Sequence, residues 1–166
     1  DTDRSRGLGD VYKRQVQTGL EALRSGCDIV TDTQMAKAGI NKTILASLGG
    51  EVHCFMSDPD VAAEAKSRGV TRAWVSMEKA AQLKKPCIFA IGNAPTALVS
   101  LDALMAAELL RPALLIGVPV GFVNVVESKE LIIEGGRAPY IVARGRKGGS
   151  NVAAAICNAL LYQIRR

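Results

Sequence analysis

Apolar residues along the chain follow two alternating patterns. Val16, Leu20 and Leu23 recur at the spacing of one helix face, and Gly26 then supplies a helix stop. Short runs of almost continuous apolar residues predict strands that are buried on both faces of a sheet. The runs that we assign to strands are Asp28 to Thr31, Glu51 to Phe55, Cys87 to Ile91, Ala113 to Val118 and Tyr140 to Ala143.

Helices are predicted before, between and after these strands. Asp58 offers an N-cap, with Pro59 at the first helical position. Strands that alternate with helices favour a parallel sheet covered on both faces. We therefore expect an α/β protein with a three-layer, flavodoxin-like fold and a five-stranded parallel sheet in the order 2-1-3-4-5. The predicted helical segments are 16–25, 32–39 (a passage from loop to helix), 58–66, 76–82, 96–110, a helix after Phe122 to about 133, and 151–164.

Residues 1–15 differ from the remainder of the chain. They contain seven charged residues and two glycines, and they show neither helical nor strand periodicity. They look like translated linker sequence, so we leave them out of the fold prediction. We expect an unrelated, linker-like segment at 1–15 and one α/β domain at 16–166.

Composition and charge exclude several classes of partner. The net charge is +5, from 21 basic and 16 acidic residues, and the positive residues are dispersed. They form no basic stripe with interleaved aromatic residues, so we expect no nucleic-acid partner. The apolar runs are too short to cross a bilayer, so we expect no membrane partner. The small excess of positive charge is compatible with a polyanionic small molecule as ligand. The alternative is that this excess has no functional meaning.

The cysteines and the single histidine do not suggest a metal site. Cys27, Cys54, Cys87 and Cys157 are far apart in the sequence and form no C-x-x-C pair. Each lies in an apolar segment, so we expect free, buried thiols and a cytoplasmic location. We interpret His53 as a partly packed residue of the second strand and not as a catalytic group.

A ligand site is expected where the carboxyl ends of the strands meet, at the switch point of the sheet. The loops Asp32 to Met35, Gly92 to Thr96 and Gly117 to Gly121 all lie at such ends. Glycines allow close approach of the backbone, and helix N-termini offer N–H groups to anions. Asp32, Asn93 and Thr96 are candidate binding residues here, although on local pattern alone the role of a helix cap is the commoner explanation for each.

The segment Arg144 to Ser150 adds a second candidate feature. It carries three basic residues and three glycines directly before a predicted helix that Ser150 can cap. This combination favours a carboxylate or phosphate group, which Lys147 would attract. The alternative is a glycine-rich turn with a solvated basic rim. Arg72 follows a turn and, taken by itself, has the pattern of a solvated surface residue.

Four of these stretches together resemble one protein family. They are Asp32 to Gly39 (DTQMAKAG), Ala90 to Leu98 (AIGNAPTAL), Gly117 to Lys129 (GVPVGFVNVVESK) and Gly145 to Ala155 (GRKGGSNVAAA). With them, the chain from Val16 to near its C-terminus resembles the precorrin-8X methylmutases, also called cobalt-precorrin-8 methylmutases.

The resemblance implies a flavodoxin-like homodimer that needs no cofactor. The implied reaction is an isomerisation in cobalamin biosynthesis, which shifts one methyl group between adjacent ring carbons of a tetrapyrrole, the corrin precursor. Its product is hydrogenobyrinate or cobyrinate. Arg72 matches an arginine that the family places at the tetrapyrrole. The residues that we assign to substrate binding are Arg72, Asp32, Gln34, Asn93, Thr96, Lys147 and Ser150.

The resemblance also implies a difference. Family members carry a longer N-terminal segment, which holds the histidine used as general acid. We therefore expect a truncated fragment that has no catalytic residue of its own and is inactive. A second hypothesis is that the chain is a non-catalytic, flavodoxin-like module that binds an anionic small molecule.

Overall fold

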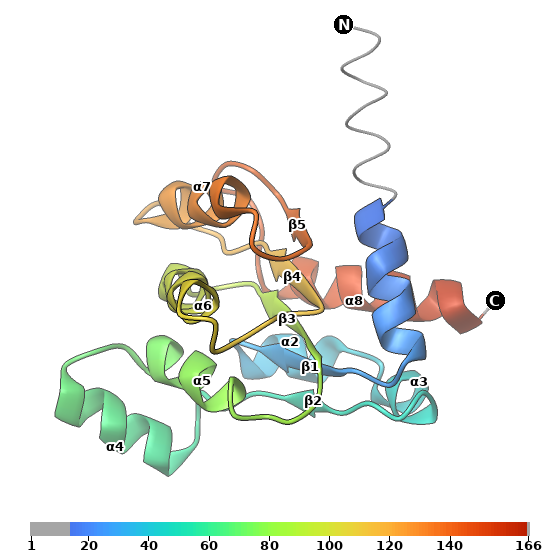
Figure 1. The fold of residues 1–166 in the computed structure, drawn as a ribbon, viewed down its shortest axis with the longest axis horizontal. Coiled ribbons are helices and arrows are strands. Elements are labelled where there is room, and N and C mark those ends of the chain that lie inside the picture. The colour runs from blue at the N-terminus through green and yellow to red at the C-terminus, as the bar shows by residue number, and fades with distance from the viewer. Residues whose placement is uncertain (1–13, 166) are drawn as a thin grey trace, which may run out of the picture.

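The computed structural model describes residues 14–165, and its strands form one parallel sheet (Figure 1). The strands are β1 (Asp28–Thr31), β2 (Val52–His53), β3 (Cys87–Ile91), β4 (Leu114–Gly117) and β5 (Tyr140–Val142). They are parallel throughout and stand in the order β2-β1-β3-β4-β5. The predicted fold class and strand order are therefore confirmed.

Helices cover both faces of this sheet, as Figure 1 shows. One helix spans residues 14–24 and precedes β1. The others are α2 (Gln34–Gly39), α3 (Lys42–Ser47), α4 (Pro59–Arg68), α5 (Arg72–Ala80), α6 (Pro95–Ala106), α7 (Val125–Gly135) and α8 (Ser150–Arg165).

Side chains that alternate along the strands divide the interior into two cores. Helix 14–24, α3 and α8 cover one face, where they pack on residues such as Ile29, Ile88 and Ile116. Helices α5, α6 and α7 cover the other face and pack on residues such as Val30 and Phe89. Because successive strand residues point to opposite faces, fully apolar strands such as β3 supply both cores at once.

Helix α4 stands outside these layers and packs on α5 instead of on the sheet. Val61 and Ala65 of α4 form a small cluster with Val75 of α5. Asp58 stands at the N-cap position with Pro59 next to it, as expected. However, the Asp58 carboxylate makes no capping hydrogen bond and instead accepts one from Lys79 Nζ at 2.7 Å.

Three helix starts differ from the sequence-based expectation. Thr33, and not Asp32, caps α2, because its hydroxyl accepts a hydrogen bond from the N–H of Ala36. Helix α5 begins at Arg72, four residues before the predicted start at Ser76, since Thr71 caps it. Helix α3, which we did not predict, is only six residues long and is capped by Asn41.

The expected boundary at Val16 falls inside the first helix. Gln15 belongs to this helix, and its side-chain oxygen accepts a hydrogen bond from the N–H of Tyr140, the first residue of β5, at 3.1 Å. The helix is therefore attached to the edge of the sheet through a residue that we had placed in the linker-like segment. Residues 1–13 lie outside the described part of the chain, so the linker assignment stays a prediction there.

The cysteines are free and buried. Burial raises the pKa of the Cys27 and Cys157 thiols to about 12 and that of the Cys87 thiol to about 11. They therefore act as small apolar core residues. Within the described residues, no helix has both the length and the apolar character needed to span a bilayer.

Candidate functional site

The carboxyl end of β1 is tied to the loop after β3 through one buried side chain. Asp32, which follows β1 and is 1% exposed, accepts three backbone hydrogen bonds. They come from the N–H groups of Gly92 at 2.9 Å, Asn93 at 2.9 Å and Ala94 at 2.6 Å. Burial raises the pKa of the Asp32 carboxyl above its ordinary value, although these hydrogen bonds oppose the shift.

Asp32 therefore does not offer its carboxylate to a ligand. Both oxygens are engaged by the backbone that leads into α6, and the side chain is closed off from solvent. We had counted Asp32 among residues that contact substrate, and its geometry is instead that of a support for the Gly92–Ala94 turn. In the sequence, an aspartate before a helix has the same appearance whether it contacts a substrate or supports a neighbouring turn.

The start of α8 joins the same cluster of loops. The hydroxyl of Ser150 lies 2.8 Å from that of Thr33, so it connects α8 to the loop after β1. Gly92 packs against the backbone at the start of α8. A Cβ atom at position 92 would come within 2.7 Å of the Gly149 carbonyl oxygen and of the Ser150 Cα. A side chain at position 92 would push α8 away from β3.

The loop after β4 completes the cluster. The N–H of Gly149 donates to the Val118 carbonyl oxygen at 2.8 Å, and the N–H of Gly121 donates to the Arg146 carbonyl oxygen at 3.1 Å. Gly148 lies so close to the same Val118 oxygen that there is no room for a Cβ atom. The loops after β1, β3, β4 and β5 thus converge at one end of the sheet, as the switch-point rule predicts.

A buried lysine to which the sequence analysis assigns no role supports residues 144–150, which we call the basic loop. Lys129 of α7 is 0% exposed, and its Nζ donates to the carbonyl oxygens of Gly145 at 2.8 Å and Lys147 at 2.9 Å. Burial lowers the pKa of this ammonium. The pattern of α7 contains the signal, because Val125, Lys129 and Ile132 share its buried face.

The remaining predicted residues surround this cluster on its solvent side. Gln34, Asn93 and Lys147 are exposed. Thr96, in the first turn of α6, accepts a hydrogen bond from the Thr71 hydroxyl at 3.1 Å. This contact brings Arg72, the exposed first residue of α5, to the same end of the sheet as Thr96.

A hollow and several exposed apolar side chains lie at this end. A cavity of about 280 Å³ opens between the first turns of α6 and α7, with Pro95, Thr96 and Asn124 in its wall. Apolar side chains in the loop after β4 and in the first turns of α2 and α8 stand in solvent. They are Met35, Val120, Phe122, Val123 and, in the first turn of α8, Val152. Arg146 lies 5.5 Å from the centre of the Phe122 ring.

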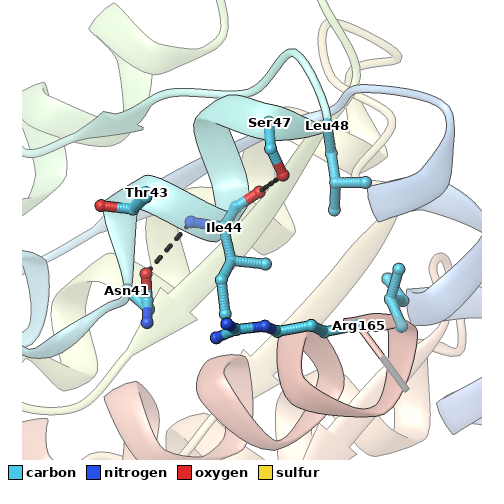
Figure 2. Close-up of a pocket in the computed structure, with 7 residues that line it drawn as sticks. Asn41, Thr43, Ile44, Ser47, Leu48 and Arg165 are labelled. Atoms are coloured by element: carbon cyan, nitrogen blue, oxygen red, sulfur yellow. Dashed lines mark hydrogen bonds between the residues drawn. The ribbon is translucent and has the colours of Figure 1, made fainter.

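A second hollow, of about 460 Å³, lies between α3 and the last turn of α8 (Figure 2). Helix α8 starts at the converging loops, and its 16 residues carry the chain about 24 Å away from them. Two of the polar side chains in this hollow are used by α3 itself: Asn41 accepts from the Ile44 N–H, and Ser47 donates to the Ile44 carbonyl oxygen. This hollow is therefore separate from the converging loops.

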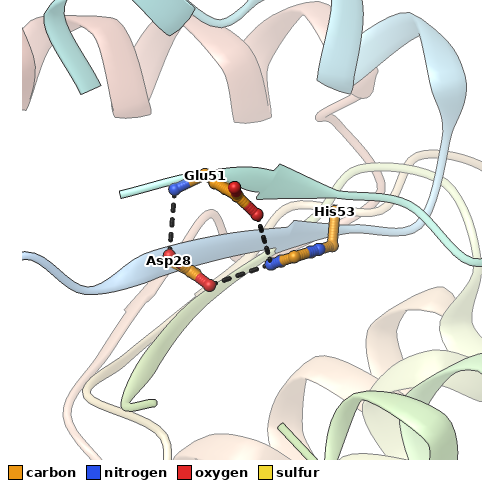
Figure 3. Close-up of side chains that lie close together, drawn as sticks. All are labelled: Asp28, Glu51 and His53. Carbon is orange, nitrogen blue, oxygen red and sulfur yellow. Dashed lines mark hydrogen bonds and ion pairs between the residues drawn. The ribbon is translucent and has the colours of Figure 1, made fainter. Parts of the chain in front are cut away.

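His53 belongs to an ion-pair network at the opposite, amino end of β1 (Figure 3). The carboxylate of Asp28, the first residue of β1, lies 2.9 Å from His53 Nε2 and 2.9 Å from Lys85 Nζ, and accepts from the Glu51 N–H at 2.9 Å. Asp32 lies four positions after Asp28, which is about 13 Å along an extended strand. His53 is thus held away from the converging loops.

Asp28, Glu51 and His53 also form the one group in the described residues whose ligand atoms approach one another closely enough to surround a metal ion, within 4.8 Å. Lys85 already places a positive charge on the Asp28 carboxylate. Burial by itself would raise the pKa of the Asp28 carboxyl, but the hydrogen bonds from His53 and Lys85 outweigh it and hold the pKa below its ordinary value. The arrangement is therefore an ion-pair network that joins β1, β2 and the start of β3.

The sequence as a whole matches one family model, described as precorrin-8X methylmutase, over residues 8–163. The chain belongs to the precorrin-8X methylmutase family. It is 43% identical over 163 residues to a cobalt-precorrin-8 methylmutase of Leptospira interrogans, with 94% of this chain and 74% of that protein covered. It is 49% identical over 146 residues to one of Salmonella typhimurium, with 87% and 67% covered.

A solved structure supports the same assignment. The precorrin-8X methylmutase of Thermus thermophilus superposes with a TM-score of 0.82 at 38% identity, covering 90% of this chain and 71% of that one. The methylmutase match begins at residue 8, inside the segment that we had set apart as a linker. The family assignment from the sequence therefore agrees with the fold of the structure.

Asp32→Asn should destabilise the protein. The amide offers one acceptor where two carboxylate oxygens now receive three N–H groups, and its own NH₂ would face those donors. The expected loss is about 1–3 kcal/mol, or roughly 2–4 °C in Tm for each kcal/mol. Asp60→Asn, at an exposed carboxylate on α4, is the matched control and should change Tm much less. Equal effects of the two substitutions on thermal denaturation would contradict the role of Asp32.

Asp28→Asn should lower Tm in a pH-dependent way. Because the folded-state pKa of Asp28 lies below the ordinary value of 3.8, its ion pairs stabilise the fold above that pH. This contribution is lost as the pH falls through the folded-state pKa. The Tm difference between variant and parent should therefore be largest near neutral pH and narrow below pH 3.8. A difference that is constant from pH 7 to pH 3 would show that this carboxyl does not link stability to pH.

Proposed function

We propose that the chain serves the reaction of its family, an isomerisation in cobalamin biosynthesis in which a methyl group moves between adjacent ring carbons of precorrin-8X or cobalt-precorrin-8. The observation that carries this proposal is the family match over residues 8–163. The geometry that supports it is the convergence of four loops at the carboxyl end of the sheet, where open α/β sheets bind ligands.

The chemistry of such a substrate suits this surface. A corrin precursor is a large, rigid ring with many carboxylate side chains, so it needs both apolar contact and cationic anchors. Exposed Met35, Val120 and Phe122 provide apolar area beside the cations of Arg146 and Lys147. We propose that the residues in direct contact with substrate are Arg72, Gln34, Asn93, Thr96, Lys147 and Ser150, and that Asp32 positions the turn beside them.

The methyl shift is redox-neutral and intramolecular, so we propose that it needs no cofactor. Protonation of the conjugated ring would make it electron-poor and ease migration, and an imidazolium is a suitable donor near neutral pH. His53, the single histidine of the sequence, is bonded to Asp28 at the other end of β1. We therefore propose that residues 1–166 do not supply the general acid and that the chain by itself is inactive.

A second candidate function is binding without catalysis. The basic loop, the N-termini of α6 and α8, and the absence of a suitable proton donor among the described residues favour a module that binds an anionic small molecule. A spectral titration with a hydrogenobyrinate-type corrin separates tetrapyrrole binding from phosphate or flavin binding. We further propose that the assembled enzyme is a homodimer and is located in the cytoplasm.

Arg72→Ala should weaken corrin binding. If Arg72 anchors a substrate carboxylate, the substitution removes a charge-assisted contact of about 1.5–3 kcal/mol, so affinity should fall roughly ten- to hundredfold. The measurement is an absorption titration of the chain joined to the N-terminal segment of a relative. Arg68→Ala, at an exposed arginine paired with Glu78, is the control and should leave affinity unchanged. Unchanged affinity in Arg72→Ala would show that Arg72 is a solvated surface residue that does not anchor the substrate.

The chain of residues 1–166 should show no methylmutase turnover and at best weak binding of product-like corrins. The same chain joined to the N-terminal segment of the cobalt-precorrin-8 methylmutase of Leptospira interrogans should show turnover if that segment carries the general acid. Turnover is followed by the absorption change from precorrin to corrin. Comparable turnover of the two proteins would place the proton donor within residues 16–166 and overturn the assignment of the general acid.

A further inference from the structure

Lys129 is a buried cation without a carboxylate partner among the described residues. The neighbouring carboxylate of Glu130 pairs with Arg144, at 3.6 Å from its Nε. Among the described residues, Lys129 Nζ donates only to the carbonyl oxygens of Gly145 and Lys147. Burying an ammonium that has only dipoles around it is unfavourable. Its presence under the basic loop therefore calls for an explanation.

The two hydrogen bonds fix the direction of the peptide groups in the loop. In a trans peptide the C=O and the following N–H point in opposite directions, and no cis peptide occurs in the described residues. Because the oxygens of Gly145 and Lys147 point to Lys129, the N–H groups of Arg146 and Gly148 point away from it. Neither N–H donates a hydrogen bond within the described part of the chain.

The loop cannot relax easily out of this arrangement. Gly149 donates to the Val118 carbonyl oxygen, and Gly148 lies against the same oxygen with no room for a Cβ atom. Gly145 and Gly149 adopt φ values of +86° and +127°, which are accessible to glycine and strained for other residues. The loop is thus held from two sides, by Val118 directly after β4 and by Lys129.

We propose that Lys129 is a positioning residue for carboxylate recognition. Its ammonium turns the loop carbonyls inward, so that the N–H groups of Arg146 and Gly148 and the side chains of Arg146 and Lys147 meet one carboxylate of the substrate. The buried positive charge attracts the same anion through the loop and is offset by it. This inference rests on the proposed function, because it assigns the carboxylate to the corrin precursor.

The first test compares Lys129→Met, which removes the donors and the charge, with the parent chain. Hydrogen exchange of the two amides whose hydrogen bonds tie the loop, those of Gly149 and Gly121, should accelerate at least tenfold, and trypsin should cleave after Arg146 or Lys147 sooner. The amides of β1 and β3 should exchange as before. Lys66→Met, at an exposed lysine of α4, is the matched control and should alter neither measurement. Unchanged exchange in the loop of Lys129→Met would overturn the proposal.

The second test separates recognition of a carboxylate from a general loosening. In the chain joined to the N-terminal segment of a relative, Lys129→Met should weaken binding of a hydrogenobyrinate-type corrin at least tenfold, while the same corrin with its carboxylates esterified should bind with unchanged affinity. Equal losses for the acid and the ester would overturn the proposal, because they would show that only the fold is damaged. Tighter or equal binding of inorganic phosphate compared with the corrin acid would also overturn it, since the loop would then serve another anion.

If Lys129→Met does not fold, Lys129→Gln decides, because it keeps two N–H donors without the charge. A folded Lys129→Gln protein that binds the corrin acid at least threefold more weakly supports the proposal, and unchanged affinity overturns it.

Failure of the proposed function gives a different result from failure of this inference. In that case the parent chain joined to a relative's N-terminal segment binds no corrin, while hydrogen exchange still reports whether Lys129 holds the loop.

Discussion

The geometry of the candidate site depends on the Asp32 carboxylate more than on any other single group. Three backbone N–H groups from the loop after β3 converge on it, across 60 to 62 residues of sequence. Parallel strands share no hairpin that would hold their carboxyl ends together, so the loops that follow them need such a connection. A buried carboxylate is suitable because two oxygens can accept several N–H groups at once.

A second buried charge, of opposite sign, does the same for the loop before α8. The Lys129 ammonium donates to carbonyl oxygens, whereas the Asp32 carboxylate accepts from N–H groups, and each charge is engaged by the backbone and not by an opposite side chain. Glycines at 92 and 148 then bring the two loops into direct contact with their neighbours. The exposed side chains of the site therefore stand on backbone whose direction is set by electrostatics and whose spacing is set by the missing Cβ atoms.

The sheet order and the location of the site could be predicted from the sequence, because both follow from local patterns and a general rule. Apolar runs gave β1, β3 and β4 to within a residue at each end. Contacts between distant segments could not be predicted in the same way. An aspartate before a helix looks like a cap, and only the fold shows that Asp32 faces the loop after β3 while Thr33 makes the cap. Helix α3 escaped prediction because six residues are too few to establish a periodicity.

The buried cysteines have a practical consequence for following this site in solution. Thiolates, not thiols, react with maleimides and similar reagents, and burial keeps Cys27, Cys87 and Cys157 protonated well above neutral pH. Cys54 is also buried. A single new cysteine on an exposed loop position, such as Phe122 at 80% exposure, would therefore take up a fluorophore or spin label selectively in the folded protein. The native chain can serve as its own background for such labels, with no cysteine removed from the core.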